Sequence, residues 1–580
     1  MTSASYILGV HQSGPISSAA LLGDGKIIAA SPEERFSRIK HDRSFPHRAI
    51  DFCLRRAGIG YEDLAEIAIG WNPGENAALK YRPGFSDWMR YPGEWLASVP
   101  NHLLSSMNRT TPFEVTGTES IFRLGQKGVP DRAVKIHYID HHTCHARLAL
   151  ETSGFDSCAV VVIDGFSEQK VTSAYHARNG KIELVHREVF PNSLGCFFAA
   201  MTDYLGYRPF SDEWKVMGMA AYGDASRVAS LDPLIGLVSE GSYELDLGYF
   251  DFFNFDRPKA FSKKLESLLG PARQENENLS RRHFDAAAAT QNLLEKTLSH
   301  YFGFVRRLTG EARLAFSGGV AMNCLFNGKI VDRNLFSRVH IPFAPDDSGN
   351  SIGAALERAR ANGSTISLAG QTPALGADAH DDQIGAALDR FKLRAKRPAE
   401  LPRYVARLLA EDKVVGWVRG RSEFGQRALG HRSIFASPCK PGMKDRLNQA
   451  VKYRESYRPF APMLPLDRVK DFFTTQDLDS VRYMEKAFTF RDSVRGQVPS
   501  VVHHDGTGRV QTVTPSEEPE LHQILCEFES LTGVPVILNT SFNLAGEPIV
   551  NSVEDSLKTF ITSGIDAIVM GEFVIEKPVF

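Results

Sequence analysis

The 580-residue sequence lacks the features of a secreted or membrane-spanning protein. Its seven cysteines form no Cys-x-x-Cys pair, and their wide scatter is typical of reduced thiols rather than of a disulfide framework. No apolar run approaches the ~18 residues that a membrane span needs. The first residues have neither a basic stretch nor a long apolar core, so no signal peptide is expected. We therefore expect a cytoplasmic protein.

An excess of charge of either sign is also missing, because 69 acidic residues face 67 basic ones and the net charge is −2. Proteins that attract nucleic acid or anionic lipid through their overall field carry a marked positive excess. We therefore predict no nucleic-acid partner and no membrane partner. The length and the 43% apolar content predict an ordinary globular protein of two or three domains.

The usual nucleotide fingerprints are absent as well. The sequence has no Gly-x-x-x-x-Gly-Lys-[Ser/Thr] motif and no Gly-x-Gly-x-x-Gly after a predicted strand. In their place, VKYRESYRPFAP at 451–462 and LNTSFN at 538–543 bring cations and small polar residues to short spacing, a combination that suits two phosphorylated compounds. The residues concerned are Lys452, Arg454, Arg458, Asn539, Ser541 and Asn543.

The surrounding stretch is unusually basic. Residues 419–458 hold ten Lys or Arg against three acids, a net +7 in a nearly neutral chain. Gly, Pro and aromatic residues interrupt the stretch, so it is not one solvated helix face. An anion pocket is the favoured interpretation, and a partner-binding or solvated patch is the alternative. The pocket would also draw on Arg421, Arg427, His503 and Arg509.

Two segments of the N-terminal half, 6–30 and 158–185, resemble each other. Each reads as strand, polar turn, strand, Asp-Gly or Asn-Gly turn, and strand, and such turns indicate hairpins because both central residues need positive φ. The repeat predicts a duplicated α/β fold, although two unrelated hairpins would give the same pattern. A Gly-, Ser- and Pro-containing stretch at 362–380 indicates a linker and places a domain boundary between 365 and 400.

Four residues of the N-terminal half are candidate metal ligands. His141 and His145 lie four residues apart on a predicted helix, so both imidazoles share one face, although surface or capping histidines show the same spacing. Asp164 ends the apolar strand AVVVID, and Asp347 lies just before a predicted helix. Ligands collect at the carboxyl ends of strands in open α/β sheets, so the four residues could converge on iron or another mid-series divalent ion.

Two turns rich in small residues could approach a phosphate. In SGGVAMN at 317–323, Gly318 and Gly319 would let the backbone come close to a phosphate or adenosine, and Asn323 ends the motif. A plain tight turn is the alternative. In EWKVMGMAAYG at 213–223, Lys215 could reach a phosphate or remain a solvated lysine. Strands are also predicted at 313–316, 414–418, 534–538 and 565–569.

At these residues the chain resembles the O-carbamoyltransferase family of the nodulation-protein-U and tobramycin/cephamycin carbamoyltransferase type. The resemblance runs nearly end to end. The stretches that carry it are PEERFSRIKHDRSFP, HHTCH, VIDG, SLGCFFAAMTDYLGY, KVMGMAAYG, SGGVAMNCLFNG, GRSEFGQRALGHRSI, VKYRESYRPFAP, DGTGRVQTV and LNTSFNLAGEPIV.

The resemblance implies an α/β fold of two domains. Residues 1–370 are expected to form an actin-like domain, a duplicated ribonuclease-H-like fold of the TsaD type. Residues 371–395 are expected to be a linker, and residues 396–580 a YrdC-like domain. The K-x-R and S-x-N signatures of YrdC match Lys452-x-Arg454 and Ser541-x-Asn543.

The family also implies a two-stage reaction. Carbamoyl phosphate and ATP with Mg²⁺ would give carbamoyl-adenylate in the YrdC-like domain. The carbamoyl group would then pass to a hydroxyl of a small natural product in the TsaD-like domain, beside Fe²⁺ or another divalent metal on the two His and two Asp residues. A monomer or homodimer is expected. The implied catalytic residues are Arg427, Lys452, Arg454 and Arg458, and the implied nucleotide contacts are Gly165, Lys215, Gly318, Gly319, Asn323, Arg421, His503, Arg509, Asn539, Ser541 and Asn543.

The chain departs from the family pattern near the acceptor. Family members often carry His-Asp before the Ser-Ala-Ala of the first hairpin, where this chain has Pro15-Ile16. One glycine of the family's Asp-Gly-x-Gly-Glu is missing from 164–168, and Gln426 stands where proline is usual. We therefore expect an unusual acceptor pocket, with the aromatic-rich residues 71–123 as a candidate wall. Ordinary core packing of these aromatic side chains is the alternative.

Two other functions remain open from the sequence. A tRNA-modifying enzyme of the threonylcarbamoyl type could use the same fold types, but it would need a broad basic surface. A non-catalytic nucleotide-binding scaffold would explain the SGGVAMN turn and Asp164, but it would not explain the second, cation-rich domain.

Overall fold

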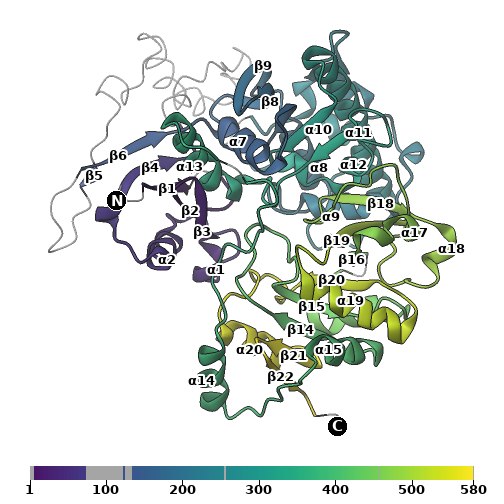
Figure 1. Cartoon of the computed structure of the whole chain (residues 1–580). Coiled ribbons are helices and arrows are strands. Elements are labelled where there is room, and N and C mark those ends of the chain that lie inside the picture. Colours follow the sequence, from purple (N-terminus) through teal and green to yellow (C-terminus); the bar gives the residue numbers. More distant parts are fainter. Residues whose placement is uncertain are drawn as a thin grey trace. The chain divides into compact units, whose positions relative to one another are not determined.

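The protein is described here by a computed structural model that covers residues 5–12, 14–72, 122–123, 133–253, 257–366, 368–455 and 457–578. The chain forms two compact units (Figure 1). Unit 1 comprises 1–30, 43–322 and 334–370, and unit 2 comprises 31–42, 323–333 and 371–580. Among the described residues, none of the helices has the length and apolar character of a membrane span.

Unit 1 contains two sheets of the same design. In each, the first of three consecutive strands pairs antiparallel with the second, and two further strands continue the sheet in parallel on its other side. The first sheet has one additional edge strand, which is antiparallel to its neighbour. The first sheet has the order β3-β2-β1-β4-β6-β5 and the second β13-β12-β7-β8-β9. Their strands are β1 (Tyr6–His11), β2 (Ser18–Gly23), β3 (Lys26–Pro32), β4 (Leu64–Ile69), β5 (Phe122–Arg123), β6 (Ala133–Tyr138), β7 (Ser157–Ile163), β8 (Lys170–Arg178), β9 (Lys181–Val189), β12 (Arg313–Ser317) and β13 (Arg338–His340). The shared order and directions give unit 1 a duplicated α/β fold.

The two hairpin turns form as the sequence predicts. Asp24 and Gly25 have φ of 50° and 75°, and Asn179 and Gly180 have φ of 49° and 76°. Positive φ at both central residues matches the right-handed twist of the flanking strands and so favours a tight hairpin.

Helices α7 (His141–Ser153) and α13 (Asn350–Ala361) link the two sheets of unit 1. They pack on each other, α13 also packs on β1 and β4, and α7 also packs on β7 and β12 (Figure 1). Helix α7 begins where the Asp140 carboxylate accepts a hydrogen bond from Thr143 N at 2.9 Å. The other longer helices of unit 1 are α2 (His47–Ala57), α8 (Leu194–Tyr204), α9 (Glu213–Ala220), α10 (Lys263–Leu269) and α11 (Arg281–Thr309).

Unit 2 is built on a nine-stranded mixed sheet. Its order is β17-β18-β19-β16-β20-β15-β14-β21-β22. The strands are β14 (Val415–Val418), β15 (Arg432–Ala436), β16 (Ala461–Pro465), β17 (Phe473–Thr474), β18 (Lys486–Phe490), β19 (Thr507–Val513), β20 (Ile537–Ser541), β21 (Ala567–Met570) and β22 (Phe573–Glu576).

Helices cover this sheet with two separate apolar cores. One core joins the sheet to α15 (Leu401–Ala410) and α19 (Pro519–Thr532), with fully buried Trp417 among its members. The other joins it to α14 (Asp381–Phe391), α16 (Met443–Leu447) and α20 (Val553–Ile561). Because apolar residues are buried on both faces, strands such as β14 and β15 are buried throughout rather than alternating.

Segments distant in sequence complete unit 2. Arg35 donates to the carbonyl of Gly425 at 2.8 Å, and Asn327 donates to that of Glu485 at 2.9 Å. The stretch 371–395, expected as a linker, also belongs to unit 2, because it contains α14 and buries Ile384 in the core.

Candidate functional site

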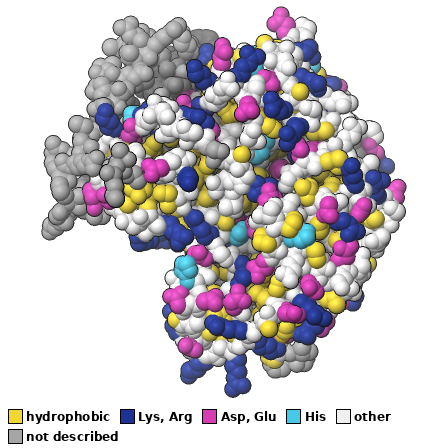
Figure 2. Space-filling model, in the orientation of Figure 1, with side chains coloured by type: hydrophobic (Ala, Val, Ile, Leu, Met, Phe, Trp, Pro, Cys, Tyr) yellow, Lys and Arg dark blue, Asp and Glu magenta, His cyan; other side chains and the backbone are white. Residues whose placement is uncertain are grey.

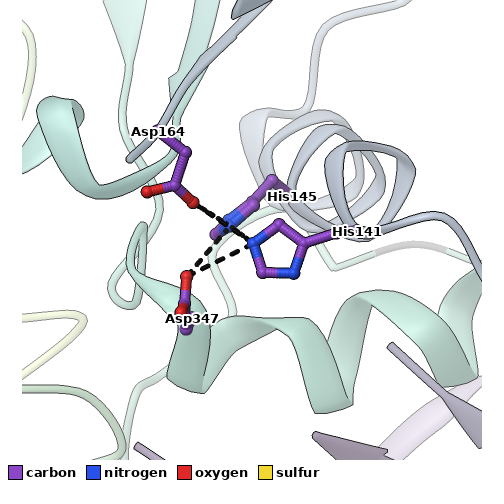
Figure 3. A group of neighbouring side chains, drawn as sticks. All are labelled: His141, His145, Asp164 and Asp347. Atoms are coloured by element: carbon purple, nitrogen blue, oxygen red, sulfur yellow. Dashed lines mark hydrogen bonds and ion pairs between the residues drawn. The ribbon is translucent and has the colours of Figure 1, made fainter. Parts of the chain in front are cut away.

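Four predicted metal ligands converge in unit 1 (Figure 3). His141 and His145 project from α7, Asp164 follows β7, and Asp347 begins the turn before α13. The His141 Nε2 atom lies 3.2 Å from Asp164 Oδ2 and 3.3 Å from Asp347 Oδ1, and the His145 Nε2 atom lies 3.1 and 3.6 Å from the same oxygens. All four residues are buried, and their donor atoms lie within 4.8 Å of one another.

The electrostatics of this cluster favour a cation. Burial alone would lower the pKa of His141, but the charges of Asp347 and Asp164 raise it well above the usual value. Burial likewise opposes ionisation of Asp164, yet hydrogen bonds from His141 and His145 bring its pKa well below the usual value. Two buried carboxylates thus draw positive charge into the site.

The surrounding backbone fixes the aspartate. The Asp164 Oδ1 atom accepts hydrogen bonds from Gly165 N at 2.7 Å and from Gly319 N at 3.3 Å, which leaves Oδ2 facing the imidazoles. The structure therefore brings two of the predicted nucleotide-contact glycines, Gly165 and Gly319, to the predicted metal ligand Asp164. The neighbouring Gly318 donates its N–H to the Pro345 carbonyl at 2.8 Å.

We expect Gly318→Ala to lower the free energy of unfolding by about 2–3 kcal/mol. Gly318 has φ of +91°, and an added Cβ would lie 2.3 Å from the carbonyl oxygen of Ile163. Gly363→Ala is the matched control, because Gly363 has φ of +80° but open space around it, so that only the backbone cost applies. Urea denaturation of both variants measures the difference, and equal losses would refute the predicted clash.

Three further residues touch this cluster. The sequence interpretation assigned no role to His11 or Asn350, and it included Trp71 only as the start of the candidate acceptor wall. His11, at the end of β1, is buried with Nδ1 3.3 Å from the Gly70 carbonyl and Nε2 3.9 Å from Asp347 Oδ2. Asn350 places its side-chain amide nitrogen 3.1 Å from His141 Nδ1. Trp71 lies edge-on to the His141 ring at 5.6 Å. The internal repeat could have indicated His11. His11 ends the first strand of one repeat, and Asp164 directly follows the first strand of the other.

Glu168 fixes the start of helix α7. Its buried carboxylate accepts hydrogen bonds from His141 N at 3.1 Å and from Asn72 N at 2.7 Å. Burial, and to a lesser extent the charge of Asp140, raises the pKa of Glu168 to about 7. Residues 73–121, most of the predicted acceptor wall, lie outside the described residues.

The second candidate site lies in unit 2, where Lys452 is only 4% exposed. Its Nζ donates to the Ser541 carbonyl, to Asn543 Oδ1 at 2.9 Å and to the Asn543 carbonyl at 3.1 Å. Ser541 Oγ in turn donates to Asn543 Oδ1 at 2.6 Å. Lys452 and Ser541 are 89 residues apart in the sequence. The Lys-x-Arg and Ser-x-Asn motifs are thus in direct hydrogen-bond contact.

Arginines surround this lysine. Burial lowers the pKa of Lys452 well below its usual value, and the charges of Arg454 and Arg458 lower it further. Burial also lowers the pKa of Arg454 well below its usual value, and the charges of Arg458 and Arg509 add to this effect. Burial raises the pKa of the Cys324 thiol against the opposing charges of Arg509 and Arg427, so both arginines lie near that thiol. So many cations in one half-buried place destabilise one another unless an anion lies among them.

Polar residues line the edge of this cation cluster. Buried Asn539 donates to the Ala428 carbonyl at 3.2 Å, and its Oδ1 has no hydrogen-bond partner among the described residues. Burial lowers the pKa of His503 to about 4 against the charge of Asp505, and Arg509 lowers it further. Asn539 therefore contacts the residue that follows Arg427 in the chain, and His503 lies near Arg509.

One cation of the cluster comes from the N-terminal part of the sequence. Lys40, in the segment 31–42 that unit 2 includes, is near enough to contribute to the lowered pKa of Lys452. It lies in the quoted stretch PEERFSRIKHDRSFP, but nothing local in that stretch indicates a contact with residues four hundred positions later.

Three predicted nucleotide contacts have other partners. Lys215 donates to Asp212 Oδ2 at 3.2 Å, and its Nζ lies 5.0 Å from the centre of the Tyr207 ring. Asn323 falls in unit 2, where its side chain accepts from Phe326 N and starts the short helix α12 (Cys324–Asn327). Arg421 donates to the Gly376 carbonyl at 3.2 Å. A nucleotide-binding role for these three stays a prediction.

The comparison with known families covers almost the whole chain. Carbamoyltransferase N-terminus matches residues 6–356, and Carbamoyltransferase C-terminus matches residues 406–577. The chain therefore belongs to the carbamoyltransferase family, and it is a carbamoyltransferase enzyme.

Among its relatives, nodulation protein NolNO of Sinorhizobium fredii is 33% identical over 96% of this chain and 78% of its own length. Nodulation protein U of the same species is 34% identical over 91% of this chain and 92% of its own length. An uncharacterized protein of Synechocystis is 33% identical over 99% of this chain and 97% of its own length.

Proposed function

We propose that the protein is an ATP-dependent O-carbamoyltransferase that works in two stages. Unit 2 would form carbamoyl-adenylate from carbamoyl phosphate and ATP with Mg²⁺, and unit 1 would pass the carbamoyl group to a hydroxyl of a small natural product. The observation that carries the proposal is buried Lys452, held by Ser541 and Asn543 and surrounded by arginines.

The cation cluster suits the first stage. Carbamoyl phosphate would lose phosphate to one water, and an oxygen of the resulting carbamate would attack the α-phosphorus of ATP and displace pyrophosphate. All reactants are anions that repel one another, so Lys452, Arg454 and Arg458 would hold them together and stabilise the charge that develops. Adenylation matters because it gives the unreactive carbamate a good leaving group.

The donor set in unit 1 fits a divalent transition metal. Four donors at ~2.1 Å from one ion lie ~3.0–3.4 Å apart, and the imidazole–carboxylate separations of 3.1 to 3.6 Å match this spacing. Two imidazoles and two carboxylates suit Fe²⁺ or a neighbouring ion with positions left for ligand oxygens. We therefore assign His141, His145, Asp164 and Asp347 to a bound metal.

Asn350 fits the same assignment. A metal-bound imidazole keeps its remaining proton on Nδ1 and needs an acceptor there. The Asn350 Oδ1 atom is buried without a partner among the described residues, while the amide nitrogen lies 3.1 Å from His141 Nδ1. The same nitrogen also lies 3.3 Å from His141 Nε2 and 3.1 Å from His145 Nε2, so half a rotation of the amide would bring the orphaned oxygen to Nδ1 and to both proposed ligand nitrogens.

The metal would supply Lewis acidity to a phosphate or hydroxyl oxygen. In the second stage, the acceptor oxygen would attack the carbamoyl carbon, lose its proton and expel AMP. The chain's own groups prepare this step: Gly165 and Gly319 orient Asp164, Glu168 fixes the start of α7, and burial of the cluster limits hydrolysis of the mixed anhydride.

We also propose kinship with two known fold types. The repeated sheets of unit 1 support an actin-like, TsaD-type domain, and the contact between Lys452 and Ser541-x-Asn543 supports a YrdC-like unit 2. Two relatives are named nodulation proteins, which fits a secondary metabolite as the acceptor.

A tRNA-type substrate is less well supported. Figure 2 shows Lys and Arg side chains interspersed with Asp and Glu over the visible face of the described residues, rather than gathered into a broad basic surface. The cations that do gather lie around a largely buried lysine, which suits a small anion better than a nucleic-acid backbone.

Mass spectrometry of the first-stage product tests the proposal. The purified full-length protein, with ATP and Mg²⁺, receives carbamoyl phosphate in one reaction and threonine with bicarbonate in another. Carbamoyl-adenylate from the first reaction alone is the expected result. Adenylate from the second alone would assign the protein to tRNA modification, and none from either metal-loaded reaction would favour the nucleotide-binding scaffold.

A further inference from the structure

Tyr453 separates the two cations of the Lys-x-Arg motif and has an unusual backbone. It ends the π-helical turn Asn448–Lys452 with φ of 45° and ψ of 53°. Its side chain is 59% exposed, whereas every other described residue of 451–460 is buried or half-buried. Positive φ is an outlier for a bulky residue, and both π-helical turns and such outliers concentrate at functional sites.

The backbone conformation itself has a clear role. It lets residues on either side of Tyr453 turn inward: Lys452 Nζ reaches Ser541 and Asn543, and Arg454 donates to Asn448 Oδ1 at 2.8 Å. The Tyr453 ring is thereby turned outward. Glycine or asparagine would adopt this conformation with less strain, so the convergence of the cations does not account for an aromatic side chain here.

A ligand that combines phosphates with a planar ring would account for it. Carbamoyl phosphate has no ring, whereas ATP presents a nucleobase a short distance from its phosphates. We propose that Tyr453 forms the nucleobase subsite of unit 2, stacking on the adenine of ATP while Lys452, Arg454 and Arg458 hold the phosphates. This inference rests on the proposed function, because it requires ATP to bind in unit 2.

Two properties make the ring suitable. Its Cα is fixed between two residues whose side chains are anchored by hydrogen bonds, so little freedom remains to be lost on stacking. Stacking also tolerates any base, because every base has an aromatic face. The ring therefore distinguishes a nucleoside triphosphate from an inorganic polyphosphate, and the cations alone do not.

Calorimetric titration of the full-length protein with ATP and with inorganic tripolyphosphate, both with Mg²⁺, tests the subsite. We expect Tyr453→Gly and Tyr453→Asn to weaken ATP binding about tenfold and to leave tripolyphosphate binding unchanged. Tyr453→Phe keeps the ring and should bind both ligands as the wild type does. The Gly and Asn variants relieve backbone strain, so their melting temperatures should not fall.

The outcomes separate this subsite from the function on which it rests. Unchanged ATP binding in Tyr453→Gly, with ATP binding lost in Lys452→Met, would overturn the subsite and leave the function standing. Equal losses for ATP and tripolyphosphate would also overturn it, because Tyr453 would then act on the cations. A wild type that binds neither ligand would overturn both the subsite and the proposed function.

Discussion

The Lys452→Met variant is expected to form carbamoyl-adenylate about 100- to 1,000-fold more slowly than the wild type. Methionine keeps most of the apolar stem but removes the charge that Ser541 and Asn543 hold in place. Burial and the arginines already make that charge unfavourable in the ligand-free protein, as the lowered pKa of Lys452 indicates. An anion bound among these cations would offset that cost and favour the charged form of Lys452. Release of pyrophosphate from ATP in the presence of carbamoyl phosphate measures the effect.

Lys440→Met is the matched control for this variant. Lys440 belongs to the same basic stretch, but its ammonium group pairs with Asp412 and its side chain is 68% exposed. We expect its rate to equal that of the wild type. Equal rates for Lys452→Met and the wild type would show that Lys452 has no role in adenylate formation. Equal losses of rate in the two lysine variants would show that the loss of one positive charge anywhere in the basic stretch has the same effect.

Asp164→Asn is expected to lower metal affinity about 100-fold or more and the rate of carbamoyl transfer to a similar extent. The substitution preserves the shape of the side chain and leaves an oxygen for the N–H groups of Gly165 and Gly319. It removes the negative charge that draws a cation to His141 and His145. Metal content by elemental analysis and transfer from pre-formed carbamoyl-adenylate to an accepted hydroxyl compound measure the two effects.

Asp156→Asn provides the comparison, because Asp156 is exposed just before the opposite end of the same strand, β7. It should retain both metal and transfer. Adenylate formation should be unchanged in Asp164→Asn, since the residues proposed for that step lie in unit 2. Loss of transfer without loss of metal would contradict the assignment of Asp164 as a ligand.

The sequence predicts best the features that depend on neighbouring residues. The Asp-Gly and Asn-Gly pairs predict both hairpin turns, because the backbone requirement is local to two residues. The four-residue spacing of His141 and His145 places two ligands on one helix face in the same way. In open α/β sheets, ligand-binding residues gather at the carboxyl ends of strands, so the sequence also predicts the convergence with Asp164 and Asp347.

Features that depend on partners far along the chain escape such reasoning. The strand expected at 534–538 instead runs Ile537–Ser541, because its polar end pairs with β15, Ser541 opposite Ser433 and Asn539 opposite Phe435. Nothing near Lys40 indicates its proximity to Lys452. Nor does the sequence show that 323–333 leaves the unit that contains SGG at 317–319, since each half of that motif is locally a plausible turn.

The passage of the backbone between the two units has a consequence for how the enzyme is made. The chain changes unit after residues 30, 42, 322, 333 and 370, so neither unit is a continuous piece of the sequence. During synthesis, residues 31–42 emerge hundreds of residues before the sheet of unit 2 that they join. Unit 2, the proposed site of adenylate formation, therefore cannot be obtained whole from a shorter gene that starts at residue 371. A protease that cuts near residue 370 would leave an N-terminal fragment that still supplies residues 31–42 and 323–333 to unit 2.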